Sequence, residues 1–271
     1  MTDNDEPKMK AWLPTAVIVG FYGTITSVKW EDEVVIPFIK NNLRSFIDAH
    51  WSDMRLADIL SNLRSESLDH RFRFEHDDCP IVSGDEDGEQ NVKKSMVDYL
   101  IWQINKKNES ESNYAIQRDI RQEAMAKGAL KTHLFEDVKP AFDMWSKNMN
   151  IYLYTSIGIE DLKFLLQHTT VGDLTPTIKG YFSQKESNAA KMVANSLPDF
   201  IKYATSINLN KTPAKVLIVT SFGKEAKASA DAGMESILVK RTGNTKIRDY
   251  YEARFDSVDS FLDIQFVPRR S

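Results

Sequence analysis

The sequence predicts an α/β protein in which a parallel sheet is flanked by helices. Three short runs rich in apolar and β-branched residues, at 16–19, 151–154 and 216–220, are typical of buried strands. Between the first two runs, apolar residues recur at three- and four-residue spacing, which favours amphipathic helices. In a parallel α/β sheet, ligands bind just past the carboxyl ends of the strands. We therefore expect chemistry in the turn 20–26, which follows the first run.

Composition indicates a globular protein of a reducing compartment. The chain has 271 residues, 42% of them hydrophobic, which is enough to bury a full core as one large domain or as a domain with an inserted cap. The net charge of −4 offers no basic surface for nucleic acid, and the single cysteine, Cys79, excludes an intramolecular disulfide. No run approaches the roughly 18 apolar residues of a membrane span, and the N-terminal segment 1–10 is too polar for a signal peptide. We expect a cytoplasmic protein, or a nuclear one, with no membrane or nucleic-acid partner.

The order of the expected elements divides the chain into a tail, a core and an insertion. Residues 1–13 offer no apolar face to bury, so we expect a disordered tail there. The strand runs place an α/β core at 14–30 and 131–271. Helical periodicity fills the stretch between them, which predicts a helical insertion over 31–130.

Within the insertion, proline and glycine residues indicate where the helices break or end. Pro37 is expected to break the first helix, and Gly128 is a plausible cap after the last one. The acidic, glycine-bearing run 84–89 cannot pack and is expected to be an exposed loop. The expected helices lie at 33–51, 91–104 and 114–127.

The turn after the first strand resembles the first motif of the haloacid-dehalogenase phosphatases, in particular the enolase-phosphatase (acireductone synthase) family of methionine salvage. That family has a strand followed by Asp-Ile-Glu-Gly-Thr-Thr. In this sequence the same frame is Gly20-Phe21-Tyr22-Gly23-Thr24-Ile25. The frame matches, but Gly20 and Tyr22 stand where the family has its two acids.

The resemblance extends over about residues 16–262, in the same order of motifs. It implies a Rossmann-like parallel sheet with an all-helical cap that closes over the substrate. It also implies that Ser221 occupies the position of the aspartate that completes the magnesium site, in the family's strand-Thr-Asp-x-x-x-Glu-Ala motif. The matching stretches are 35–39, 50–51, 97–98, 102–103, 135–145, 168–174, 180–182, 216–226 and 239–244.

Three side chains are candidates for a residual phosphate site. Thr155 and Ser156 follow the second strand, where the family has Tyr-Ser-Ser-Gly-Ser, and hydroxyls beside a helix start can bind phosphate. The same hydroxyls could instead cap the helix expected to begin near Glu160. Lys185 is the nearest candidate for the family's phosphate-neutralising lysine, although the run around it is shortened and a solvated surface lysine is the simpler interpretation.

In the family that this sequence resembles, the acids that are replaced here carry out catalysis and bind the metal. One carboxylate attacks phosphorus, a second protonates the leaving group, and Mg²⁺ neutralises developing charge. Gly20 has no side chain, Ser221 is neutral, and Tyr22, with an unperturbed pKa near 10, is a poor ligand for a hard metal. Losing a covalent nucleophile costs on the order of 10⁴ to 10⁶ in kcat, roughly 5 to 8 kcal/mol of barrier. We expect no catalytic residues, no metal and no cofactor.

Two interpretations of function follow from the resemblance. The first is a pseudoenzyme that acts by binding a protein partner, an active paralogue or a phosphorylated metabolite. The second is an active acireductone synthase, a Mg²⁺-dependent hydrolase that acts on a 2,3-diketo-5-methylthiopentyl phosphate. The triplet Gly20, Tyr22 and Ser221 separates them, because active members should carry acids there. An unrelated α/β protein with ordinary turn residues at these positions is a third alternative.

Overall fold

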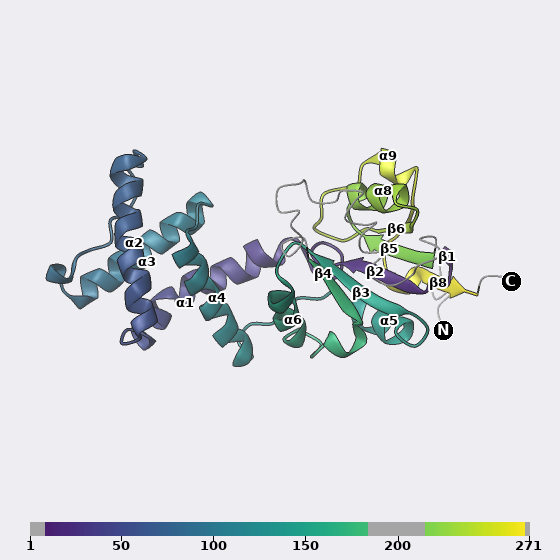
Figure 1. The fold of residues 1–271 in the computed structure, drawn as a ribbon, viewed down its shortest axis with the longest axis horizontal. Coiled ribbons are helices and arrows are strands. Elements are labelled where there is room, and N and C mark those ends of the chain that lie inside the picture. Colours follow the sequence, from purple (N-terminus) through teal and green to yellow (C-terminus); the bar gives the residue numbers. More distant parts are fainter. Residues whose placement is uncertain (1–8, 184–214, 269–271) are drawn as a thin grey trace. The chain divides into compact units, whose positions relative to one another are not determined.

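The computed structural model describes residues 9–183 and 215–268. The chain divides into two compact units (Figure 1). The first, which we call the core unit, comprises Met1–Trp30 and Lys131–Ser271. The second, which we call the helical unit, comprises Glu31–Leu130. Every strand in the described part of the chain belongs to the core unit.

The core unit is built on a six-stranded sheet in which every neighbouring pair is parallel. This confirms the predicted α/β class, and the three predicted runs correspond to β2, β3 and β5. All five residues of β2 are buried, as expected for a central strand covered on both faces. In spatial order the strands are β4 (Gly180–Ser183), β3 (Asn150–Thr155), β2 (Ala16–Gly20), β5 (Val216–Thr220), β6 (Glu235–Val239) and β7 (Asp256–Val258).

The register brings the carboxyl ends of the central strands to one edge. Ala16 is aligned with both Asn150 and Val216, so the three strands start together and run in the same direction. Gly20 therefore lies beside Tyr154 of β3, and the preceding residue lies beside Val219 of β5. The turn after β2 begins at this edge.

Apolar side chains fill both faces of the sheet. On one face, Ile18 and Ile218 belong to a buried cluster to which Ala228 and Met234 also contribute. On the other face, Val17 and Val19 are completely buried. The helices of this unit are α5 (Val138–Trp145), α6 (Ile159–Gln167), α8 (Gly223–Asp231) and α9 (Asp249–Glu252).

The expectation of a disordered tail over 1–13 is wrong for its last part. Met9–Trp12 forms β1, which pairs in parallel with β8 (Ile264–Val267) in a separate two-stranded sheet. Its backbone groups find partners at the far end of the sequence, a pairing that local composition does not reveal. Residues 1–8 lie outside the described part of the chain.

The helical unit contains four long helices. In α1, Ile39, Leu43 and Ile47 recur at four-residue spacing and are completely buried, which explains the predicted amphipathic pattern. A polar network ties α3 to α4, because the amide of Asn113 donates to the Leu100 carbonyl at 3.1 Å and to Gln103 at 2.9 Å. The helices are α1 (Ile36–Ala49), α2 (Met54–Leu68), α3 (Glu89–Lys106) and α4 (Glu111–Ala126).

The helix boundaries refine the sequence-based expectations. Glu31–Val35 is a π-helical turn, and α1 then begins with Pro37 in its first turn, where a missing N–H costs nothing. The predicted break is therefore a change of helix type. Gly128, with φ of +73°, follows the C-cap of α4, Lys127, as expected for a glycine just past a helix end. The acidic run is exposed and contains a single 3₁₀ turn, Asp85–Asp87.

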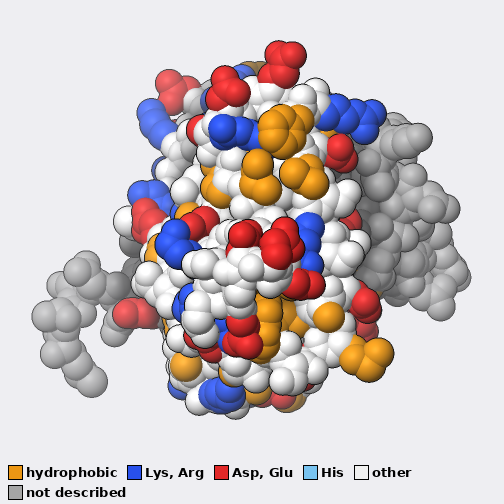
Figure 2. Space-filling model, turned by 90° about the vertical axis from the view of Figure 1, so that its left-hand side faces the viewer, with side chains coloured by type: hydrophobic (Ala, Val, Ile, Leu, Met, Phe, Trp, Pro, Cys, Tyr) orange, Lys and Arg blue, Asp and Glu red, His pale blue; other side chains and the backbone are white. Residues whose placement is uncertain are grey.

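The surface drawn in Figure 2 mixes acidic, basic and hydrophobic side chains, and neither charge dominates this face. Among the described residues, none of the helices combines the length and the apolar character needed to cross a membrane.

Candidate functional site

The turn that follows β2 is compact and held by its own backbone. The carbonyl of Phe21 accepts hydrogen bonds from three successive N–H groups, those of residues 24–26, at 3.0 to 3.3 Å. Gly23 has φ of +73°, a left-handed value that glycine adopts without steric cost, and its N–H donates to the Thr26 carbonyl at 2.8 Å. The fold thus fixes the backbone at the position where we expected chemistry.

The space beside Gly20 is occupied by a hydroxyl group. A Cβ added to Gly20 would lie 2.9 Å from Thr24 Oγ1 and 3.7 Å from Thr220 Oγ1. Thr24 Oγ1 is held in place because it accepts the N–H of Ser221 at 3.1 Å. Any side chain at position 20 would therefore have to displace a threonine that joins this turn to the end of β5.

Ser221 faces inward and completes this connection. It is 6% exposed, and its hydroxyl donates to the carbonyl of Gly23. The amide of Asn244 donates to the same carbonyl at 2.7 Å. Both lone pairs of the Gly23 oxygen thereby accept hydrogen bonds. The Ser221 hydroxyl is used to stabilise the backbone of the turn.

A buried ion pair between Arg241 and Asp137 also holds the turn in place. Arg241 donates from Nε to the Thr24 carbonyl at 2.8 Å, and from Nη1 to both carboxylate oxygens of Asp137 at 2.9 and 2.8 Å. Its guanidinium lies 4.5 Å from the ring centroids of both Phe135 and Phe261. Burial lowers the pKa of Arg241, and the Asp137 carboxylate opposes that shift. Asp137 also accepts the N–H of Phe261 at 2.6 Å, whereas Nη2 of Arg241 is buried without a hydrogen-bond partner among the described residues.

Glu225 is a carboxyl group buried at the start of α8. It is 7% exposed and accepts a hydrogen bond from the hydroxyl of Thr220, the last residue of β5. Burial raises the pKa of Glu225 to about 7, against the opposing effect of the Thr220 hydrogen bond. The only cause of a higher pKa is desolvation, so the neutral acid is favoured here more than in water.

The remaining sequence candidates lie in different environments. Tyr22 is half-buried, and its ring packs edge-on against Phe21 with centroids 4.8 Å apart. Thr155 is buried and accepts the N–H of Ile157 at 3.3 Å, whereas Ser156 is exposed. The capping alternative for these two hydroxyls is wrong, because α6 has Gly158 as its N-cap and no side-chain capping bond. Lys185 lies outside the described residues.

Comparison with known proteins connects this architecture to a family. No family model matches the chain. It is 24% identical over 252 residues to an enolase-phosphatase E1 from Anopheles gambiae, covering 93% of this chain and 82% of the relative. It is 25% identical over 261 residues to an enolase-phosphatase E1 from Xenopus tropicalis, covering 93% and 95%. Over nearly its whole length the chain is therefore similar to enolase-phosphatases E1. The crystal structure of the UTR4 protein from Saccharomyces cerevisiae shares the fold, with a TM-score of 0.68 at 16% identity, covering 92% of this chain and 98% of that one.

At the ends of β2 and β5, the described residues of this enolase-phosphatase-like chain do not supply the donor set that a magnesium ion would need. Mg²⁺ prefers carboxylate oxygens and water in octahedral geometry. Position 20 has no side chain, and the Ser221 hydroxyl is neutral and bonded to the Gly23 carbonyl. Within the described residues, no three His, Cys, Asp or Glu side chains cluster as a metal site would require. The groups present therefore do not fit the metal that the family resemblance implies.

Asp137 and Arg241 were not singled out by the sequence as site residues. Both lie in stretches that match the enolase-phosphatases, at 135–145 and 239–244. The signal was therefore present, but nothing local indicates that residues 104 positions apart form one buried pair. Their role in this structure is to hold the turn, since Arg241 reaches the Thr24 carbonyl and Asn244 reaches that of Gly23.

Proposed function

We propose that this chain is a catalytically inactive relative of the enolase-phosphatases that acts by binding a protein partner, an active paralogue or a phosphorylated metabolite. The supporting observation is the hydrogen-bonding of Ser221. Its side chain and its N–H bind the turn after β2, at Gly23 and Thr24 respectively. Where the family resemblance calls for a metal-binding carboxylate, the chain has a hydroxyl that stabilises its own backbone. We expect the protein to act in the cytoplasm.

A phosphatase assay tests the loss of catalysis. The purified full chain is incubated with p-nitrophenyl phosphate and increasing Mg²⁺, and we expect no Mg²⁺-dependent release of nitrophenol. The matched control is Tyr22→Phe, which removes the phenol hydroxyl at the position of the family's second acid and should leave the baseline unchanged. Turnover that rises with Mg²⁺ and disappears in Tyr22→Phe would overturn the proposal.

The second candidate is acireductone synthase activity in methionine salvage. What favours it is that the relatives matched over nearly the whole chain carry the name enolase-phosphatase E1. It predicts release of inorganic phosphate from a 2,3-diketo-5-methylthiopentyl phosphate under conditions where an aryl phosphate is inert. A negative result with both substrates leaves the binding role as the surviving candidate.

Two measurements address the binding role. Titration with inorganic phosphate, followed by ¹⁵N-resolved NMR, should perturb the N–H groups around Thr155 and Ser156 if the site after β3 is retained. Thr155→Val, which keeps the shape and removes the hydroxyl, should abolish that perturbation. For a protein partner, capture from native extract by the intact chain is compared with capture by a chain in which the acidic run 84–89 is replaced by a neutral glycine–serine segment.

A further inference from the structure

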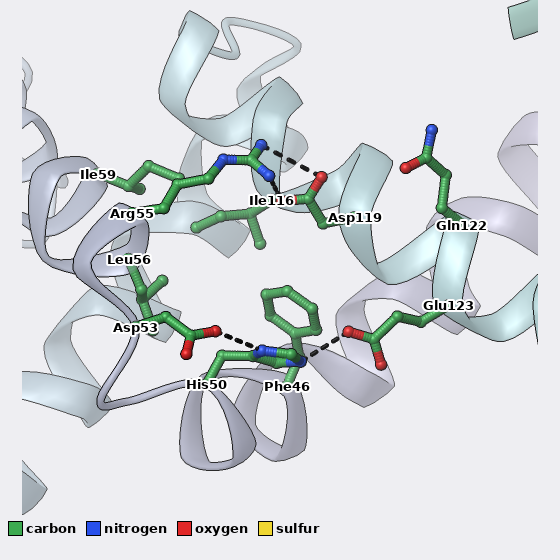
Figure 3. Close-up of a pocket in the computed structure, with 10 residues that line it drawn as sticks. All are labelled: Phe46, His50, Asp53, Arg55, Leu56, Ile59, Ile116, Asp119, Gln122 and Glu123. Atoms are coloured by element: carbon green, nitrogen blue, oxygen red, sulfur yellow. Dashed lines mark hydrogen bonds and ion pairs between the residues drawn. The ribbon is translucent and has the colours of Figure 1, made fainter.

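A cavity of about 300 Å³ lies within the helical unit, lined by α1, α2, α4 and the turn between the first two (Figure 3). One part of its lining is apolar. Leu56, Ile59 and Ile116 are buried around it, and the ring of Phe46 lies near its base. The other lining residues are polar or charged, and the volume is at the lower end of the range of small-molecule sites.

His50 sits beside this apolar lining between two carboxylates. Its Nδ1 lies 2.7 Å from Asp53 Oδ2, and its Nε2 lies 2.6 Å from Glu123 Oε1. Its ring also packs on Phe46, with centroids 4.4 Å apart. Two carboxylates and an aromatic face are the surroundings that proteins use to hold a cation.

The other charged groups around the cavity are paired with one another, so the positive charge between Asp53 and Glu123 comes from the proton of His50. Arg55 and Asp119 neutralise each other through two contacts, at 2.8 and 3.2 Å. Lys127 binds the outer oxygen of Glu123 at 2.9 Å, from the exposed surface. Arg118 lies 3.8 Å from Asp119 and adds to that pair. With a neutral imidazole, Asp53 and Glu123 would face each other across the cavity wall with no cation between them.

We propose that this cavity binds an organic cation with an apolar body, whose ammonium group lies between Asp53 and Glu123 and whose body covers Phe46, Leu56 and Ile116. The ammonium then supplies the charge that protonated His50 supplies in the empty cavity. The imidazole gives up its proton to solvent and turns aside. This site belongs to the helical unit alone, so it stands or falls separately from the proposed loss of catalysis.

Proton release gives the proposal a specific pH dependence. The hydrogen bond that His50 donates to Asp53 raises the pKa of His50, burial opposes this shift, and the nearby charge of Glu123 adds to it. Below that pKa the cation must displace a proton, and above it the imidazole between the two carboxylates is already neutral. Affinity should therefore rise as pH increases through the His50 titration, and the pKa of His50 should fall when the site is filled.

Calorimetry on the full chain with benzylamine as the probe tests the site. Benzyl alcohol and benzoate, which share the ring but carry no charge or the opposite charge, serve as matched ligands. We expect benzylamine alone to bind, with affinity at pH 8 above that at pH 6. Glu123→Gln should weaken binding by about tenfold or more. Asp58→Asn, which removes an exposed carboxylate of α2 outside the cavity, should leave binding unchanged.

A second readout follows His50 directly. The NMR titration midpoint of its imidazole should move to lower pH in saturating benzylamine. If Glu123→Gln fails to fold by circular dichroism, Asp53→Asn replaces it, and the three-ligand comparison on the native chain needs no variant. Equal binding of benzylamine and benzyl alcohol would overturn the proposal. So would an unmoved His50 midpoint, or full affinity in both carboxamide variants.

Discussion

The hydroxyl of Ser221 donates its hydrogen bond to the carbonyl of Gly23. The two residues are separated by 198 positions in the sequence and join the end of β5 to the turn that follows β2. Because Asn244 donates to the same oxygen, that carbonyl has no capacity left for another partner. Four predictions test the consequences of this arrangement and of the groups around it.

Replacing Ser221 with aspartate should destabilise the protein. The carboxylate would be buried beside the Gly23 carbonyl, and the position would lose its donor, at a cost of about 3 kcal/mol. Chemical denaturation followed by circular dichroism measures the change. Ser221→Ala, which deletes the hydroxyl but adds no charge, should cost only about 1 kcal/mol. If the aspartate variant is as stable as the native chain, the turn tolerates an acid and the inference from Ser221 is wrong.

Gly20→Ala should reveal how tightly Thr24 fills the turn. The new Cβ would lie 2.9 Å from Thr24 Oγ1, and we expect a loss of about 1 to 3 kcal/mol from this overpacking. Thr24→Ala alone should also destabilise, because it leaves the Ser221 N–H unpaired. In the double variant the clash disappears, so the two losses should add to more than the measured total. Simple additivity would show that the hydroxyl does not occupy this space.

Breaking the Arg241–Asp137 pair should be among the costliest single changes in the core unit. Arg241→Ala leaves a buried carboxylate without its cation, a change that costs about 3 to 5 kcal/mol. Arg241→Lys should also destabilise, since the single nitrogen of a lysine cannot replace the separate Nε and Nη1 donors to the Thr24 carbonyl and Asp137, or the planar group between Phe135 and Phe261.

The matched control for this pair is Lys139→Ala. Lys139 forms an exposed ion pair with Asp143 on α5, and its loss should change stability by no more than about 0.5 kcal/mol. Urea midpoints at constant slope provide the measurement for all three variants. Equal effects of Arg241→Ala and Lys139→Ala would contradict the role assigned to the buried pair.

Glu225 should make stability fall as pH rises from about 4.5 to 7. Burial raises its pKa in the folded chain to about 7 from 4.5, so the folded protein binds the proton more tightly than the unfolded chain does. The contribution is fully present below pH 4.5 and disappears as pH passes 7, with a total on the order of 3 kcal/mol. Glu225→Gln should flatten this part of the stability profile. An unchanged slope in that variant would assign the effect to other groups.

The sequence predicted those elements of the fold that depend on local composition and periodicity. The strands β2, β3 and β5 are short, apolar and buried on both faces, so composition and length reveal them. The pairing of β1 with β8 escaped prediction because its two strands come from opposite ends of the described chain. The capping role of Thr155 and Ser156 was wrong because α6 starts at Ile159, too far on for either hydroxyl.

Some residues of the candidate site could also be predicted from local sequence, and others could not. The sequence identified Gly20, Tyr22 and Ser221 by their motif positions, and the structure places Gly20 and Ser221 around Thr24. It could not show that Arg241 and Asp137 meet, since that pair depends on the sheet order and on rings from two further segments. Residue type can be read from a motif, whereas a buried pair is a property of the assembled core.

The points where the helical unit leaves and rejoins the core are fastened to each other within the core itself. The Ser27 N–H donates to His133 Nδ1 at 3.2 Å, and the Phe135 N–H donates to the Ile25 carbonyl at 3.0 Å. The two ends of the insertion are therefore joined by hydrogen bonds between residues of the core unit. We therefore expect the core unit to tolerate a change in the length of the segment inserted between Trp30 and Lys131.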